Sequence, residues 1–213
     1  MPRLYRQIST DLPFHITGRC RNRDYFPIPM PEVWSIFEDY LFFISHAYSI
    51  EIISFVLMNN HFHLIIRAPK GNLSEAMNYL MSHTSRCINS KANIENQLWG
   101  RRFHPTLIDE NHYLTNVYKY VYRNPVEARL CDRAESYPYS TLNLKLGRGR
   151  LHFPILADEI LNESHSFTLK WVNQSVDPTD KVLMERALKR RIFILPKKVR
   201  INKKKPSLAT ELY

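Results

Sequence analysis

The pattern of apolar and polar residues is clearest between residues 51 and 67, where it predicts a β-hairpin. Two runs rich in Val, Ile, Leu and Phe flank a polar Asn-Asn pair, which is typical of two antiparallel strands joined by a short turn. Because side chains along a strand point alternately to its two faces, His61 and His63 share one face and Phe62 lies on the other. The two imidazoles are therefore expected to stand side by side, about 7 Å apart at their α-carbons.

Three longer segments repeat apolar residues every three or four positions, which is the period of an amphipathic helix. They run from residue 32 to about 47, from 73 to 88 and from 113 to about 124. Asp109 or Asn111 can cap the third helix, and Pro125 disfavours its continuation. A shorter helix is expected around residues 180–191.

Two more extended segments complete the predicted order of elements. One covers residues 14–17 and the other residues 98–108, where Gly100 and Pro105 suggest a bulge or an edge strand. The order strand, helix, strand, strand, helix, strand, helix predicts an antiparallel sheet with helices packed on one face. The fold class is therefore expected to be α+β, with a sheet of the ferredoxin-like kind.

Composition indicates a globular chain without a membrane segment. Its 213 residues are 44% hydrophobic, which suits one domain with appendages. No apolar run approaches the roughly 20 residues that a membrane helix needs, and the first residues carry no cleavage signal, so a cytosolic protein is expected. The three cysteines lie far apart without a Cys-x-x-Cys pair, which argues against a disulfide framework and a zinc knuckle.

The net charge of +10 is concentrated at the C-terminal end. Residues 186–210 hold ten Lys or Arg and no acid, whereas residues 1–185 hold 20 basic and 19 acidic side chains. A basic tail is typical either of an arm that binds a polyanion, most often nucleic acid, or of a solvated extension.

Two arginine clusters are candidate DNA-binding contacts. Arg19 and Arg21 belong to a basic loop after the first predicted strand, where they could clamp phosphates or form a solvated turn. Arg101 and Arg102 lie between two aromatic residues, a combination suited to backbone contact and base stacking. Aromatic residues at such positions more often belong to a core, so both interpretations stay open.

His61 and His63 form a candidate metal site, because their expected spacing lets both imidazoles converge on one ion. A His-x-His pair is also compatible with one half-buried and one surface histidine. Tyr120 and Asn124 are four residues apart on the third predicted helix, so they lie together and could both reach such an ion. This spacing alone does not select Tyr120 over the other tyrosines of that helix.

Five motifs occur in order along the chain: Phe-His-Ile-Thr-Gly-Arg at 14–19, Met-Asn-Asn at 58–60, His-Phe-His at 61–63, Leu-Trp-Gly-Arg-Arg-Phe at 98–103 and Tyr-Val-Tyr-Arg-Asn-Pro-Val-Glu-Ala at 120–128. Together they resemble the REP-associated tyrosine transposases, relatives of the small single-strand transposases with an HUH nuclease fold. HUH stands for His, a large hydrophobic residue and His. The resemblance covers about residues 4–143. The family often has Gly where Cys20 and Arg129 stand and Pro where Asn59 stands, which could change loop geometry.

The resemblance implies a role for each candidate residue. Tyr120 matches the nucleophilic tyrosine, and the metal ligands match His61, His63 and Asn124. The implied protein is a metal-dependent tyrosine transposase, a single-strand DNA endonuclease and strand transferase that cuts near palindromic hairpins through a 5′-phosphotyrosine intermediate. The implied cofactor is Mg²⁺ or Mn²⁺: imidazole ligands suit Mn²⁺, and cellular abundance favours Mg²⁺.

The same resemblance implies partners, location and domain organisation. The partner is single-stranded DNA with palindromic hairpins, and the location is the bacterial cytoplasm, in association with the nucleoid. Residues 1–143 would form the HUH catalytic domain, residues 144–185 a mixed C-terminal segment and residues 186–213 a basic tail. The chain could act as a monomer or as a homodimer.

Two alternatives belong to other functional classes. A domesticated relative could bind DNA hairpins without cutting them, although the complete set of ligands and tyrosine argues against this. A metal-dependent hydrolase could cut with an activated water instead. The effect of replacing Tyr120 on a covalent DNA adduct separates these hypotheses.

Overall fold

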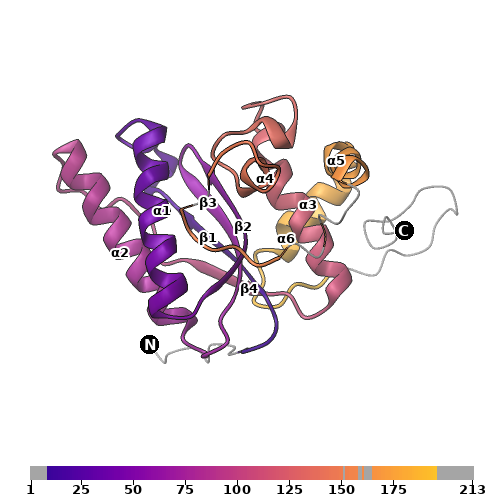
Figure 1. Ribbon diagram of the computed structural model, residues 1–213, viewed down its shortest axis with the longest axis horizontal. Helices are drawn as coiled ribbons and strands as arrows, with labels where there is room; N and C mark the ends of the chain where they lie inside the picture. Colours follow the sequence, from indigo (N-terminus) through magenta and orange to yellow (C-terminus); the bar gives the residue numbers. More distant parts are fainter. Residues whose placement is uncertain (1–8, 151, 158–159, 161–164, 196–213) are drawn as a thin grey trace, which may run out of the picture.

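Four antiparallel strands form one sheet in the order β2-β3-β1-β4 in the computed structural model (Figure 1). The structure describes residues 9–150, 152–157, 160 and 165–195. The strands are β1 (Phe14–Arg19), β2 (Glu51–Met58), β3 (His61–Arg67) and β4 (His104–Leu107). The predicted α+β fold with an antiparallel sheet is confirmed, although only four residues of the predicted extended segment 98–108 enter the sheet.

The predicted hairpin is formed by β2 and β3. The two strands pair from Met58 with His61 to Glu51 with Arg67, with one irregularity in β2. β1 pairs with β3 on one side and with β4 on the other, so it is an inner strand. The segment before residue 20 therefore lies beside the His-Phe-His motif, far from it in the sequence.

One face of the sheet is covered by α1 (Met30–Ala47) and α2 (Leu73–Ala92), which lie on the same side in Figure 1 and pack against each other. The strand residues in this core are hydrophobic and buried: Phe14, Ile16, Phe55, Phe62, Leu64 and Ile66. Phe37 and Leu41 of α1, four residues apart, join the same cluster. Burial of this apolar area supplies much of the hydrophobic stabilisation of the fold.

The opposite face is covered by α3 (Asn111–Glu127) and by shorter helices near it (Figure 1). These are η2 (Ala134–Ser136), α4 (Thr141–Lys145), α5 (His165–Asn173) and α6 (Pro178–Ala187). The prediction that helices occupy only one face was wrong. Val56 of β2 and Ile65 of β3 are buried in a second cluster with Val117 of α3, so β2 and β3 carry apolar residues on both faces and both faces need cover.

α3 differs from its prediction at both ends. Its N-cap is Glu110 rather than either candidate from the sequence. The helix also continues through Pro125, which the sequence predicted to end it. A proline in the last turn removes a single backbone donor, and the amide of Ala128 still donates to the carbonyl of Asn124, so the turn closes despite the proline.

The C-terminal helices pack back onto α3, and the segment after them runs along β4. Trp171 of α5 and Met184 of α6 belong to the same core cluster as α3. The amide of Phe193 donates to the carbonyl of Leu107 in β4 at 2.8 Å. Most of the predicted basic tail, residues 196–213, lies outside the described residues.

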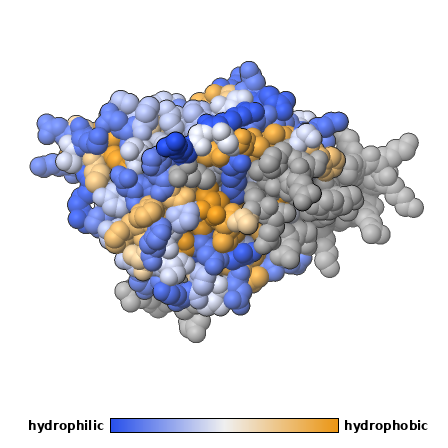
Figure 2. All heavy atoms as spheres, viewed as in Figure 1, coloured by the Kyte–Doolittle hydropathy of each residue, from blue (hydrophilic) through white to orange (hydrophobic). Residues whose placement is uncertain are grey.

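In the part of the chain that the structure describes, none of the helices combines the length and hydropathy that a bilayer crossing requires. Figure 2 shows hydrophilic side chains along the outer edge of one face, over α2, and hydrophobic ones nearer the middle. Cys20, Cys87 and Cys131 are free thiols.

Candidate active site

A cleft of about 910 Å³ opens between the second face of the sheet, α3 and α6. Its floor consists of side chains from β1, β3 and β4 that alternate along the strands with the hydrophobic core residues. α3 lines it as well, and α6 contributes Lys181, Met184 and Glu185. The cleft therefore collects residues from distant parts of the chain.

The register of the strands places the two motif histidines in a polar row. His63 on β3 pairs with Thr17 on β1, and Thr17 pairs on its other side with His104 on β4. One step along, His61 pairs with Arg19. Residues two apart on a strand share a face, and all five of these residues line the cleft.

His15 on β1 contacts the ring of His63 from one side. Its Nε2 lies 3.0 Å from Nδ1 of His63, and the two stacked rings have centroids 5.2 Å apart. Burial, with a smaller effect of His104, lowers the pKa of His15 to about 3. Burial also holds the pKa of His63 well below its ordinary value. Both rings are therefore neutral at pH 7, so one nitrogen of the pair can donate and the other accept.

This hydrogen bond determines which nitrogen of His63 is available to a ligand. Nε2 of His63 is buried and has no hydrogen-bond partner among the described residues. A histidine that binds a metal usually donates its other ring N–H to a neighbouring acceptor, which fixes the tautomer. Donation from Nδ1 of His63 to Nε2 of His15 leaves the lone pair of Nε2 on His63 for a cation. His15 then serves as the hydrogen-bond acceptor for Nδ1, a role that a carboxylate or a backbone carbonyl has in many metal sites.

His61 is held in a similar way. Its Nδ1 lies 2.7 Å from Oδ1 of Asn60, so Nδ1 donates and Nε2 carries the lone pair. Burial, followed by the positive charge of Arg19, lowers the pKa of His61 to about 3, which keeps this ring neutral as well. The ring centroids of His61 and His63 are 5.1 Å apart, so the two imidazoles lie close enough to share one cation.

Tyr120 on α3 meets the histidines from the opposite wall. Its ring contacts that of His63 edge-on, with centroids 5.7 Å apart, and its half-buried side chain lines the cleft. Burial and the nearby Glu185 carboxylate raise the pKa of the phenol to about 12, while Arg19 and a hydrogen bond with Asn124 act in the opposite direction. The phenol is therefore protonated at pH 7 and must lose its proton before it can act as a nucleophile.

Asn124 follows Tyr120 by one helical turn and lines the same cleft. Its Nδ2 donates to the carbonyl of Tyr120 at 2.8 Å, so Oδ1 is the atom left to bind a cation. No group of three or more His, Cys, Asp or Glu side chains that could hold a metal ion occurs within the described ranges. The donors of the cleft are instead His63, His61 and the amide oxygen of Asn124, a set that fits a divalent cation such as Mn²⁺.

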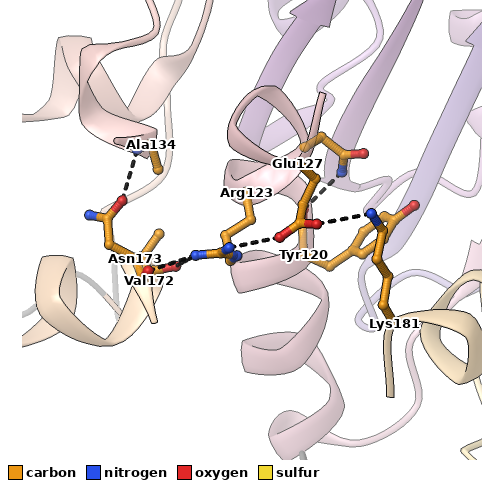
Figure 3. Close-up of polar contacts among 8 residues, drawn as sticks. Tyr120, Arg123, Glu127, Ala134, Val172, Asn173 and Lys181 are labelled. Atoms are coloured by element: carbon orange, nitrogen blue, oxygen red, sulfur yellow. Dashed lines mark hydrogen bonds and ion pairs between the residues drawn. The ribbon is translucent and has the colours of Figure 1, made fainter. Parts of the chain in front are cut away.

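Figure 3 shows how the helix that carries Tyr120 is fixed to the C-terminal helices. Arg123 of α3 donates to the carbonyl of Asn173 and to the carboxylate of Glu127, each at 2.7 Å. Glu127 also accepts a hydrogen bond from Lys181 of α6 at 2.9 Å. Burial acts to raise the pKa of Glu127, but its bonds to Arg123 and Lys181 outweigh burial and lower it.

Positive charge gathers in the cleft. The lining carries eight Lys or Arg side chains against two Glu, although residues 1–185 hold nearly equal numbers of bases and acids. The basic residues of the lining are Arg19, Arg23, Arg101, Arg102, Lys119, Arg123, Lys181 and Lys189. Such a local excess attracts a polyanion and concentrates it at the cleft.

The cleft brings together all but one of the site residues predicted from sequence. Its lining includes the predicted nucleophile, the three predicted ligands and three of the four predicted arginines: Tyr120, His61, His63, Asn124, Arg19, Arg101 and Arg102. Arg21 is exposed and does not line the cleft, although the other two residues of the short helix η1 (Arg21–Arg23) do, so its side chain lies outside the site.

Sequence reasoning missed several residues of the cleft. His15 had a detectable signal, because the alternation along β1 places it on the same face as Arg19. Lys119 lies on α3 one residue before Tyr120, but nothing in the helical pattern distinguishes it from a solvated lysine. Lys181 had no local signal, since only the packing of α6 brings it to α3.

Known proteins with a similar structure include transposases. No curated protein matches the chain. Among solved structures, a REP-associated tyrosine transposase bound to a REP hairpin matches with a TM-score of 0.59 and 20% identity, over 77% of this chain and 96% of that one. A putative transposase from Deinococcus radiodurans R1 matches with a TM-score of 0.39 and 19% identity, over 57% of this chain and 94% of that one.

The first of these similarities supports the fold, and a family model supports more. The model described as Transposase IS200 like matches residues 9–124, which is more than half of the chain. The matched segment contains the whole sheet, the histidine pair and α3 as far as Asn124. The chain therefore belongs to the IS200-like transposase family.

Proposed function

We propose that this protein is a metal-dependent single-strand DNA endonuclease and strand transferase. It cleaves next to palindromic hairpins and forms a 5′-phosphotyrosine intermediate on Tyr120. The observation that carries the proposal is the edge contact between Tyr120 and His63 inside a cleft rich in positive charge. A phenol, two neutral imidazoles and an excess of cations form a combination suited to phosphoryl transfer.

His61, His63 and Asn124 would hold a divalent cation, Mg²⁺ or Mn²⁺. When bound, the ion supplies neutralisation of the charge on the scissile phosphate and orients it for in-line attack. In the tautomer that binds a cation, Nδ1 of His63 donates to Nε2 of His15, 3.0 Å away, and Nε2 of His63 stays available. Asn60 has the corresponding role for His61.

Tyr120 provides the covalent step. Its phenol oxygen forms a bond to phosphorus, and the bond from phosphorus to the 3′ oxygen of the neighbouring nucleotide breaks. The proton lost by the phenol balances the proton gained by the leaving 3′-hydroxyl. Arg19 favours the phenolate, because its positive charge acts to lower the pKa of Tyr120. A 3′-hydroxyl of a second strand can reverse the reaction and rejoin the DNA.

Basic side chains around the phenol bind the substrate strand. Arg19, Arg101 and Arg102 are exposed at the cleft and can contact phosphates. Hairpin DNA is supported as the substrate by the bound REP hairpin of the similar solved structure, which shares this fold. Affinity for DNA is expected to fall steeply as salt rises, because several phosphates are neutralised at once.

A denaturing gel tests the proposal. Labelled single-stranded hairpin DNA is incubated with the protein and Mn²⁺, and a covalent adduct is expected to run above the free DNA. Tyr120→Phe removes the adduct and the cleavage, and so does a chelator. Tyr113→Phe, which removes a hydroxyl from the same helix beside Phe193, keeps both. Cleavage that survives in Tyr120→Phe would show that water is the nucleophile.

The second candidate is a protein that binds DNA hairpins without cutting them. It predicts equal DNA binding by the wild type and Tyr120→Phe, with no adduct from either. The buried, unpartnered Nε2 of His63 argues against this candidate, since a protein that only binds DNA has no need for it.

A further inference from the structure

A second groove, of about 550 Å³, lies on the α2 side of the molecule. It runs between α2 and the segment that leads into β4, and it is separate from the cleft of Tyr120. Arg101 and Arg102 line both. These two arginines therefore lie where the cleft and the groove adjoin, so a polymer that occupies both sites passes them.

The wall of the groove on α2 is a polar stripe. Asn78, Ser82, Arg86 and Ser90 follow one another at intervals of four residues, so they lie along one side of the helix, and all four are exposed. At a rise of about 1.5 Å per residue the stripe is about 18 Å long. This length corresponds to about five nucleotides of a strand in helical, stacked form, at a rise of about 3.4 Å each.

The charged side chains that line the groove are all basic. Its lining contains Arg86, Arg101 and Arg102 and no acidic residue. Within the described part of the chain, none of the three arginines forms an ion pair with a carboxylate. Residues 1–185 hold nearly equal numbers of bases and acids, so a lining without acids is not a consequence of overall composition. Hydroxyl and amide groups beside arginines are typical phosphate contacts.

The aromatic residues at the floor of the groove are too buried for base stacking, which argues against base recognition as its main role. Trp99 and Phe103 line it but are buried, at 6% exposure each. Nε1 of Trp99 is already engaged, since it donates to the carbonyl of Met81 at 2.9 Å. Neither ring offers an open face on which a base could stack, so the groove presents polar edges to a backbone.

We propose that this groove is a second DNA-binding site, which takes the phosphodiester backbone of the DNA that continues beyond the cleft. The proposal rests on the proposed function, because it extends the same substrate. Arg101 and Arg102 connect the two sites, and Arg86 is the contact specific to the groove. Binding here is independent of base sequence and lengthens the stretch of DNA that the protein holds.

The experiment compares DNA of two lengths on two matched variants. Arg86→Gln removes a charge from the groove, and Lys91→Gln removes one from the same helix outside the lining, where it pairs with Glu32. The short DNA contains one hairpin and the cleavage point, and the long DNA extends it by about ten nucleotides on each side, roughly twice the length of the stripe. Dissociation constants are measured by fluorescence anisotropy over a range of salt concentrations.

Arg86→Gln is expected to weaken binding of the long DNA several-fold and to reduce its salt slope by about one, while binding of the short DNA stays unchanged. Lys91→Gln changes neither. Equal losses on both lengths, or no loss on either, would overturn the proposal. Adduct formation on the short DNA is measured in parallel: its absence in the wild type counts against the proposed function, whereas the length comparison tests the groove alone.

Discussion

The two faces of the sheet use the same strands for different purposes. On the face toward α1 and α2, β1 and β3 present Phe14, Phe62 and Leu64, all buried among apolar side chains. On the other face the alternating positions of these strands carry polar groups, including His15 and His63, which border a cleft. The difference follows from the two-residue period of a strand, which lets neighbouring residues belong to separate environments.

In this small fold, the functional site lies on the face of the sheet that contributes less to the hydrophobic core of α1 and α2. Hydrophobic burial on the first face stabilises the sheet, so the second face can keep buried histidines that have unpartnered nitrogens. Such groups cost free energy when they are buried without partners. The cover on the second face is also different, since it depends on hydrogen bonds among α3, α5 and α6 as well as on apolar contacts.

The largest difference in the free energy of unfolding is expected between substitutions at two adjacent residues, Phe62 and His61. Phe62→Ala opens a cavity in the first face and is expected to lower the free energy of unfolding by about 3–5 kcal/mol. His61→Ala, at the edge of the cleft, is expected to lower it by less than about 1 kcal/mol. His61→Ala is also expected to abolish the binding of Mn²⁺ to the protein. Urea unfolding and calorimetric titration measure both quantities, and equal destabilisation would contradict the division of roles.

Arg123 tests whether the cover of the second face depends on polar contacts. Arg123 is 6% exposed, and its guanidinium joins α3 to α5 and to Glu127. Arg123→Met is expected to lower the free energy of unfolding by about 1.5–3 kcal/mol, because carbonyls and a carboxylate lose a charged donor. Lys181→Met is the control, since it breaks a more exposed pair with Glu127 and should cost less than about 1 kcal/mol. Similar losses for the two variants would refute this account.

Substitutions of His15 test whether the polar face of the sheet is organised for metal binding. His15→Ala is expected to weaken Mn²⁺ binding roughly 10–100-fold, because His63 loses the acceptor that fixes its tautomer. His15→Gln, which offers an amide oxygen as acceptor, is expected to recover part of the affinity. Titration of Mn²⁺ followed by electron paramagnetic resonance measures binding without DNA or turnover. Unchanged affinity in His15→Ala would mean that His15 only fills space.

The smallest effect is expected at Glu135, which joins η2 to α5. Burial acts to raise the pKa of this carboxyl, but hydrogen bonds from Asn173, the backbone and Arg133 outweigh it and lower the pKa. A lowered folded-state pKa gives stability that is present above the unfolded-state pKa and is lost as pH falls through the folded-state value. Glu135→Gln should therefore cost about 1 kcal/mol at pH 7 and progressively less below about pH 4.

Urea unfolding of the wild type and Glu135→Gln between pH 7 and pH 3 measures this difference. A gap between the two proteins that stays constant or widens on acidification would show that the charged form of Glu135 contributes nothing to stability.

Local patterns were sufficient for much of the fold and of the site. Alternation predicted the hairpin and the shared face of His61 and His63, and helical spacing predicted that Tyr120 and Asn124 lie together, because both periods follow from backbone geometry. The end of α3 was predicted wrongly. The preference of residues before proline against helix is a local bias, and the packing of α3 on the sheet outweighs it.

Which residues alternate, which share a helix face and which family the motifs resemble can be read from the chain alone, because these properties depend on neighbours along it. Three features emerge only when the chain is folded: helices cover both faces of the sheet, His15 contacts His63, and Lys181 reaches the helix of Tyr120. Each of these contacts joins residues 48 or more positions apart. Such pairings arise from the joint packing of the whole chain, and no local period encodes them.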